Sequence, residues 1–444
     1  MGRGEHDFDV VVIGAGMAGV AAARALASGG AQVTLLEAGH RIGGRVWSIR
    51  DFVDTPVEAG AEFVHGVGAA LWGDIRSAGL RVQPVPYLRY SWFNMGGSTR
   101  WLPHQLVHPG VWRSFDILWT LNHWQDEDMS AAALIDRKGY RGRSRVMAQL
   151  TLTAHLPGSI DEVGVQGLVA DGVLHLEEGL NHRVLDGYDV LAQHVATGLD
   201  VRFGWRVARI AWSPSGIEVS SEDGRTVRAR AGITTLPHGV LAVGTVQFDP
   251  PLPPAKTEAI ARIATGPVAK LLLSFDDRFW PARMAQLVCG DGPITLYWPT
   301  SFGTDGPPVL IAYATGPRAK ALSEAGPDLA SEVVLDDLSR LYPRARPRRL
   351  VKELRFVDWS TDPNAMGGYT FLRPGAVGAR AALAASDTGA LAWAGSATQW
   401  SPVADTVEAA YLSGLRSARQ VSLMLSGGTG QTASTTGARS PFKH

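Results

Sequence analysis

The sequence predicts an α/β fold built around a parallel sheet, on three observations. The first 37 residues alternate between strand-like and helix-like runs, strand-like runs recur in the middle of the chain, and a strand followed by a helix closes it. Strands that alternate with helices are typical of parallel sheets, because each helix carries the chain back to the same edge. A length of 444 residues is enough for two or three domains.

The first element is a strand, a tight turn and a helix. Residues 9–13 (DVVVI) form a β-branched run typical of a buried parallel strand. Gly14, Gly16 and Gly19 follow in the spacing G-x-G-x-x-G, with Ala15 inside the turn. In this motif the first glycine allows the turn, the second lets backbone approach a pyrophosphate, and the third lets helix pack on strand. The helix N-terminus then offers N–H groups to a phosphate.

The second strand ends at Glu37, 18 residues after Gly19. A carboxylate at this place hydrogen-bonds the hydroxyls of a ribose and would repel the 2′-phosphate of NADP. Strand, glycine motif, helix and acid together predict a dinucleotide-binding domain of the Rossmann type. The motif alone leaves NAD and FAD open.

The later elements are less regular. From residue 86 to about 200 the chain is aromatic-rich, and hairpin residues Glu222-Asp223-Gly224 separate two strand-like runs further on. We expect helices at 114–124, 184–197, 328–341 and 406–425, and strands within 201–233 and at 268–275, 294–298, 309–313 and 391–395.

Composition narrows the class of protein. Lysine plus arginine and aspartate plus glutamate each number 42, so the formal net charge is zero. Nucleic-acid and anionic-membrane binders need a basic excess, and we expect neither partner. The one cysteine, Cys289, excludes an internal disulfide and a Cys/His cluster, and we expect no metal site. No signal peptide or membrane span is visible, so we expect a cytoplasmic protein; its oligomeric state stays open.

Five blocks carry a family resemblance. They are LEAGHRIGGR (36–45), GAEFVHG (60–66) and the segments 234–260, 359–375 and 393–418. In this order they resemble the flavin-containing amine oxidases, a family that includes polyamine and monoamine oxidases. The resemblance covers most of the chain and is weakest over the aromatic-rich stretch. It implies an FAD-binding domain of the glutathione-reductase-like kind, interleaved with a substrate domain that carries a mixed sheet and helices.

The order of the blocks predicts two domains that interrupt each other. Residues 426–444 are rich in Gly, Ser and Thr, and we expect a disordered tail there. We expect the FAD-binding domain at 1–85, 200–265 and 380–425, and the substrate-binding domain at 86–199 and 266–379.

The resemblance also implies cofactor contacts. Arg45 follows two glycines that pass close to the flavin, and Ser396 stands where the family often has a glutamate. Covalent members have a Cys just before the Tyr of the GG-x-Y segment, and none precedes Tyr369, so we expect FAD to be bound non-covalently. Asp405 and Glu408 would add negative charge that suits a cationic substrate. The further cofactor-binding residues are expected to be Gly60, Ala61, Glu62, Val207, Trp359, Thr406 and Val407.

Three residues are the candidate catalytic set. Lys270 interrupts an apolar run, which is unusual because a buried ammonium needs a partner, and only 6 of the 42 basic residues are lysines. On position alone, an edge strand with Lys270 facing solvent is an equal alternative. The resemblance implies that Lys270 holds a water at the flavin N5. It also implies a substrate-site role for His65 and an aromatic cage with Tyr369 as one wall, the second wall falling at Thr406.

The expected reaction is FAD-dependent oxidation of a polyamine or monoamine to an imine. Hydride would pass to the flavin N5, and O₂ would reoxidise the flavin and give H₂O₂. An L-amino-acid oxidase stays open, which would need an arginine for the substrate carboxylate. So do a desaturase or dehydrogenase on the same scaffold and a flavin-bearing interaction protein without turnover.

Overall fold

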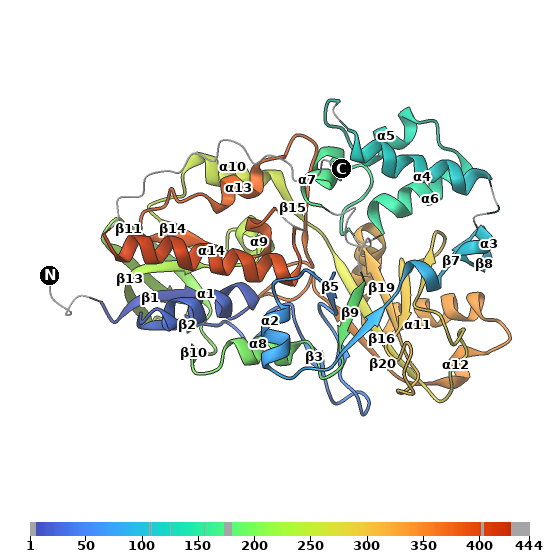
Figure 1. Cartoon of the computed structure of the whole chain (residues 1–444), viewed down its shortest axis with the longest axis horizontal. Helices are drawn as coiled ribbons and strands as arrows, with labels where there is room; N and C mark the ends of the chain where they lie inside the picture. The colour runs from blue at the N-terminus through green and yellow to red at the C-terminus, as the bar shows by residue number, and fades with distance from the viewer. Residues whose placement is uncertain are drawn as a thin grey trace.

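Two large sheets organise the chain and lie toward opposite ends of its long axis (Figure 1). The computed structural model describes residues 6–105, 107, 109–124, 126–154, 156–172, 180–400 and 404–427. Mixed sheets and helices confirm the predicted α/β class. The tail expected at 426–444 lies outside the described residues beyond Gly427.

The first sheet contains the predicted strand–helix–strand unit. β1 (Phe8–Ile13) pairs in parallel with β2 (Val33–Leu36), and α1 (Met17–Ser28) connects them. β13 (Thr226–Thr234) pairs in parallel with β1, and β22 (Leu391–Trp393) with β13. The carboxyl ends of four strands therefore share one edge, where ligands bind in such sheets. The other strands are β10 (Asp200–Arg202), β11 (Val207–Ser213), β12 (Gly216–Ser221) and β14 (Gln247–Asp249).

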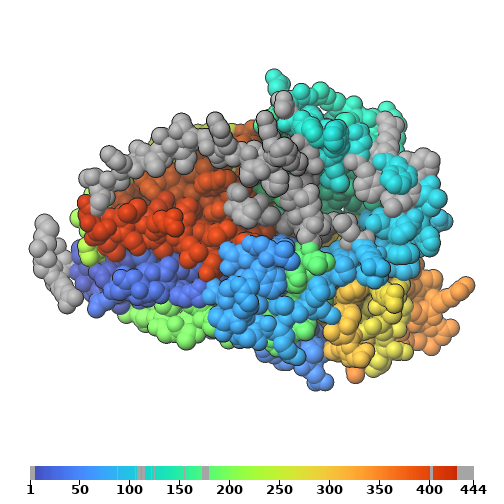
Figure 2. All heavy atoms as spheres, viewed as in Figure 1, coloured from blue at the N-terminus to red at the C-terminus, as the bar shows by residue number. Residues whose placement is uncertain are grey.

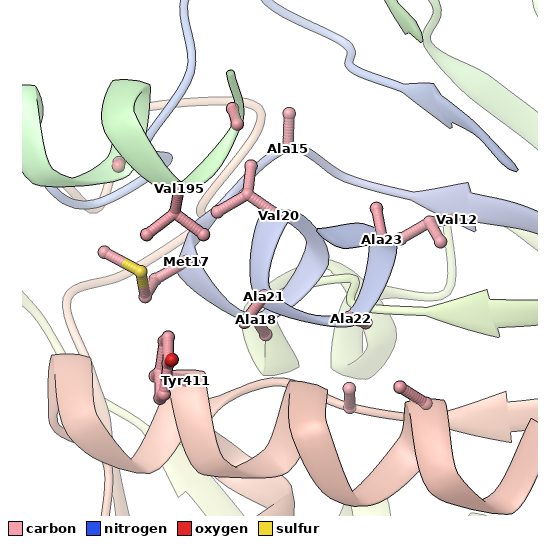
Figure 3. Close-up of a cluster of buried hydrophobic side chains, with 14 of the residues drawn as sticks. Val12, Ala15, Met17, Ala18, Val20, Ala21, Ala22, Ala23, Val195 and Tyr411 are labelled. Carbon is pink, nitrogen blue, oxygen red and sulfur yellow. The ribbon is translucent and has the colours of Figure 1, made fainter. Parts of the chain in front are cut away.

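Helix α1 packs beside α14 (Val407–Leu425) on one face of this sheet, and Figure 3 shows the two helices next to each other. Small side chains let the two helices approach closely, because a Cβ on Gly414 would lie 2.2 Å from the Ala18 carbonyl oxygen. Val195 of α8 (Asp189–Val195) joins the same core (Figure 3), although we placed this segment in the substrate-binding domain. The domain boundaries themselves stay a prediction.

The second sheet has the strand order β20-β16-β19-β18-β17-β7-β8. The interior strand β16 (Val268–Phe275) has the predicted bounds, and alternation points Leu271 and Leu273 at helix α11 (Gly316–Leu341). Lys270 therefore points to the opposite face. The helix expected at 328–341 is the second half of α11, which kinks at Gly326. The remaining strands are β7 (Ser91–Met95), β8 (Ser98–Trp101), β17 (Gln286–Cys289), β18 (Leu296–Pro299), β19 (Val309–Thr315) and β20 (Val351–Asp358).

A group of helices stands above the second sheet at the upper right of Figures 1 and 2. It comprises α4 (Pro109–Asn122), α5 (Ala131–Arg137), α6 (Gly142–Thr153) and α7 (Val165–Ala170), packed on a core of their own. Among the described residues, no helix has the length and hydropathy that a bilayer crossing requires. No group of His, Cys, Asp and Glu side chains in those residues is arranged to hold a metal ion.

Short elements connect these bodies. The helix expected at 184–197 is shorter than predicted, because Gly187 turns with a φ of +96° between β9 (Asn181–Val184) and α8. β9 pairs with β5 (Phe63–His65) and β6 (Val82–Val85) in a small antiparallel sheet. The others are β3 (Ser48–Ile49), β4 (Val57–Glu58), α2 (Trp72–Ser77), α3 (Leu102–Gln105), α9 (His238–Val243), α10 (Pro254–Arg262), β15 (Ile263–Thr265), α12 (Pro347–Leu350), β21 (Thr370–Leu372) and α13 (Ala379–Ala384).

Candidate active site

One large cavity runs from the carboxyl edge of the first sheet to the face of the second. Its volume is about 910 Å³, at the upper end of the roughly 300–1,000 Å³ of small-molecule sites. Ala15 and Gly19 lie behind its wall. All other predicted site residues line it: Gly14, Gly16, Glu37, Arg45, Gly60, Ala61, Glu62, His65, Val207, Lys270, Trp359, Tyr369, Ser396, Thr406 and Val407.

The glycine turn shapes the end of the cavity at the first sheet. Gly14 has a φ of +98°, and a Cβ on Gly19 would lie 1.9 Å from the Gly14 carbonyl oxygen. Only glycines allow this contact between β1 and α1. The first turn of α1 carries no acidic side chain, so the positive potential of its N-terminus is not neutralised there.

Two acceptors complete this end. Glu37 fixes the turn, because its carboxylate oxygens accept from the backbone N–H groups of Ala15 and Gly39, both at 2.8 Å. Asn364 also lines the cavity, and its buried Oδ1 receives no hydrogen bond from the described residues. The glycine turn and the helix N-terminus would bind the phosphates of a dinucleotide. The Glu37 carboxylate and the Asn364 amide oxygen would accept hydrogen bonds from its donor groups. Together these groups fit a dinucleotide.

A buried carboxylate lies next to Ser396. Asp405 accepts hydrogen bonds from the Ser396 hydroxyl and from the backbone N–H of Thr370, and Arg45 Nη1 lies 3.8 Å from its Oδ1. Burial opposes ionisation of Asp405, but Arg45 and Arg380 outweigh it and lower its pKa. Asp405 thus supplies, next to Ser396, the negative charge that a glutamate at position 396 would carry. Arg45 and Arg380 compensate the charge of Asp405 within the protein, and a role of Asp405 toward a cationic substrate stays a prediction.

Arg380 and Asp171 extend this network and were missed from the sequence. Arg380 is fully buried and binds both Asp171 carboxylate oxygens at 2.8 Å. Both residues line the cavity. They lie far apart along the chain in unremarkable local sequence, so only the fold pairs them. Glu408, the other acid expected near the cofactor, instead accepts from the backbone N–H of Ala70.

Lys270 lies in the interior of the sheet, since β16 has β19 on one side and β20 on the other. The solvent-facing alternative is therefore wrong. Its Nζ donates to the carbonyl oxygens of Glu58 at 3.0 Å and Gly60 at 2.8 Å, and to Glu62 Oε2 at 3.2 Å. These acceptors use all three ammonium hydrogens. A water at this place would share Lys270 with one of them.

Glu62 bonds to protein side chains, although we expected it to contact the cofactor. Its carboxylate accepts hydrogen bonds from the Arg183 guanidinium at 2.9 and 3.0 Å, from Trp298 Nε1 at 2.9 Å and from Lys270 Nζ. Burial opposes ionisation of Glu62, but Lys270 and Arg183 lower its pKa. Glu62 lines the cavity mainly as the residue that holds Lys270 and Trp298 in place.

The aromatic residue found next to Tyr369 is Tyr313 on β19, which we had not predicted as a site residue; the second aromatic wall was expected at residue 406. The Tyr369 hydroxyl hydrogen-bonds the Tyr313 hydroxyl on β19, and the Trp298 ring lies 5.3 Å from that of Tyr313. Thr406, at the expected place of this wall, caps α14 by accepting from Ala409 N–H. Alternation along 309–315 was the available signal, because Tyr313 faces the same side as Ile311.

The other predicted residues are fixed by local contacts. His65 Nδ1 lies 2.9 Å from Asn181 Oδ1, and because an amide oxygen only accepts, Nδ1 carries the proton. Trp359 donates to the Ala59 carbonyl at 3.0 Å. Tyr297, beside Trp298, points away from the cavity and donates to Asp337 at 2.8 Å.

Comparison with known proteins decides the family. Residues 17–120 and 122–422 match the model of the flavin containing amine oxidoreductases. The chain belongs to this family. The resemblance seen in the sequence is confirmed, and the chain is an oxidoreductase of a flavin-dependent class.

Individual relatives agree. Polyamine oxidase 4 of Oryza sativa subsp. japonica is 30% identical over 391 residues, covering 81% of this chain and 78% of its own. Polyamine oxidase 2 of Arabidopsis thaliana is 31% identical over 82% and 77%. The structure of cyclohexylamine oxidase from Brevibacterium oxydans superposes with a TM-score of 0.82 at 22% identity, covering 95% of this chain and all of that one, which shows the shared fold.

Proposed function

We propose that the protein catalyses the FAD-dependent oxidation of an amine, either a polyamine or a monoamine, to an imine. The observation that carries the proposal is that Lys270 and Tyr369 line the same cavity as the Gly14 turn and Glu37. FAD bound there would supply the acceptor for a hydride from the carbon next to the amine nitrogen, and O₂ would take up the electrons to give H₂O₂. The polyamine oxidases among the relatives support an amine as substrate.

The residues present would hold FAD without a covalent bond. The Gly14 turn and the N-terminus of α1 would bind its pyrophosphate, and Glu37 a ribose. Cys289 is buried between the second sheet and α11, on the face away from the cavity. The described lining therefore offers no thiol for a thioether.

The substrate end favours an uncharged amine. Burial raises the pKa of Tyr313 and of Tyr369, so both remain phenols at neutral pH. An ammonium placed between these rings would be repelled by the charge of Lys270, whereas a neutral amine keeps the lone pair that imine formation needs. The rings and the Trp298 face then position it and exclude water.

Peroxide release from the FAD-loaded protein tests this function. We expect turnover with at least one member of a panel of polyamines and monoamines, and none with L-amino acids, because Arg380 already binds Asp171 at both carboxylate oxygens. A protein that takes up FAD and oxidises no amine would contradict the proposal, and turnover confined to amino acids would replace it. A cytoplasmic location stays a prediction from the sequence.

A further inference from the structure

Three adjacent strands of the second sheet present one row of side chains to the cavity. Lys270 on β16 is the direct cross-strand partner of Tyr313 on β19, which in turn is the partner of Leu296 on β18. All three line the cavity. Side chains directly opposite each other in antiparallel strands start about 5 Å apart. The Tyr313 ring therefore stands beside the Lys270 side chain.

Contacts on both sides fix this ring. The Trp298 ring lies 5.3 Å away at 50°, and Trp298 Nε1 donates to Glu62 Oε2 at 2.9 Å. The same oxygen accepts a hydrogen bond from Lys270 Nζ at 3.2 Å. Tyr313, Trp298, Glu62 and Lys270 thus form one cluster of neighbours, in which Lys270 Nζ also lies 5.3 Å from the centroid of the Trp298 ring.

The Tyr313 hydroxyl bonds to a residue of a different segment. It bonds the hydroxyl of Tyr369, which follows Gly367 and Gly368 in a tight loop. A Cβ on Gly368 would lie 2.3 Å from Val268 Cγ2, and the Gly368 carbonyl accepts from Arg45. The start of the loop is therefore held at Gly368. At its end, the hydrogen bond between the two tyrosine hydroxyls holds the Tyr369 ring.

We propose that Tyr313 determines the specificity of the amine site. Its ring limits the space beside Lys270, and its hydroxyl holds the Tyr369 ring in place. The site therefore takes amines with an unbranched CH₂ next to the nitrogen, and it disfavours amines branched at that carbon. This inference rests on the proposed function and adds the substrate class.

Hexylamine and cyclohexylamine test it, because they have the same number of carbons and differ in branching at the reacting carbon. In the parent holoenzyme we expect kcat/KM for hexylamine to exceed that for cyclohexylamine by at least about tenfold, the usual size of one steric discrimination. Tyr313→Ala should reduce this ratio at least about tenfold. Tyr313→Phe keeps the ring and should keep the ratio within about threefold, while KM for both amines rises more than kcat falls because Tyr369 loses its partner.

Tyr297→Phe is the matched control. It removes a buried tyrosine hydroxyl bond on the opposite face of the same sheet, where Tyr297 donates to Asp337. Its selectivity ratio should equal that of the parent even where its melting temperature falls. Tyr313→Leu replaces the alanine variant if the latter does not fold with FAD.

Two results would overturn the assignment of Tyr313. One is a parent ratio near one, and the other is a ratio in the folded alanine or leucine variant within twofold of the parent. Failure of the proposed function looks different, since the parent would then release no peroxide from any amine. The dissociation constants of the two amines, measured by perturbation of the flavin absorbance, give the same ratio without turnover.

Discussion

Several buried charged residues around the cavity are paired with one another within the protein. Lys270 and Arg183 share Glu62, and the side chains of Lys270 and Glu62 are 5% and 3% exposed. Buried pairs of this kind add little net stability, but removing one partner leaves the other uncompensated, at a cost of about 3–5 kcal/mol. Substitutions here therefore combine effects on chemistry with effects on folding, and the two must be measured separately.

Replacing Lys270 with methionine should slow reaction at the flavin. The variant removes a charge and a hydrogen-bond donor from the wall of the cavity, and we expect amine-driven flavin reduction or reoxidation to fall by roughly 10- to 1,000-fold. Stopped-flow absorbance of the FAD-loaded variant measures both rates. Lys320→Met, at an exposed position of α11, is the control and should behave as the parent. Rates within a few-fold of the parent in a variant that still binds FAD would show that Lys270 has no role in the chemistry.

Among the elements, the segment from β3 to β4 links the cavity floor to α8. Glu58 of β4 is 4% exposed, and its carboxyl accepts from Tyr188 N–H at the start of α8 and from Ser48 on β3. Its own carbonyl accepts from Lys270. Burial raises the pKa of Glu58 to about 8 despite the two hydrogen bonds. A neutral carboxyl therefore joins these elements near neutral pH.

This shift predicts a pH dependence of stability. The folded protein keeps the Glu58 proton up to a pKa of about 8, whereas the unfolded chain releases it near its ordinary value of 4.5. Between these values the folded state binds more protons, so Glu58 contributes stability fully at low pH and loses it as pH rises. The loss is about 1.4 kcal/mol per pH unit. Glu58→Gln mimics the neutral form, so it should match the parent near pH 4 and exceed its stability by an increasing amount from pH 5.5 to pH 8.

Urea unfolding at several pH values measures the difference between parent and variant. Glu258→Gln, on the exposed side of α10, is the control for a lost carboxylate. A parent-to-variant difference that stays constant from pH 5.5 to 8 would show that Glu58 is already ionised in the folded protein.

At the scale of the whole molecule, the cavity joins the two sheets. Its lining runs from Gly14 and Glu37 at the first sheet to Lys270 and Tyr313 on the second. A dinucleotide bound along the cavity would contact residues of both sheets. It would add these contacts to the ones that the protein itself makes between the sheets. Binding to the folded state stabilises that state, by about 2.7 kcal/mol at a ligand concentration 100 times the dissociation constant.

FAD should therefore raise the melting temperature of the protein and leave it on denaturation. We expect acid precipitation of the yellow holoprotein to release all of the flavin into the supernatant, since Cys289 is buried away from the cavity. Absorbance of supernatant and pellet measures this, and differential scanning fluorimetry compares the apoprotein with the FAD-loaded protein. Flavin that remains with the washed pellet would show a covalent bond.

Local patterns were sufficient for the features that depend on neighbours in sequence. The spacing of Gly14, Gly16 and Gly19 predicted the turn, and the apolar run around Lys270 predicted β16 at its observed bounds. Local patterns failed for the pairs that join distant segments. The Asp405–Arg380 proximity and the Tyr313–Tyr369 bond have no signature in either partner's neighbourhood.

The sequence by itself determined the fold class, the family and the phosphate-binding turn, because these follow from backbone conformation and short spacings. The tertiary structure alone decided what each side chain does at the cavity. It made Glu62 the partner of Lys270 and Arg183, placed Arg45 beside Asp405, and brought the hydroxyl of Tyr313 to that of Tyr369. The physical reason is that a buried charge or hydroxyl takes whichever partner the packing of separate strands and loops brings within hydrogen-bond distance.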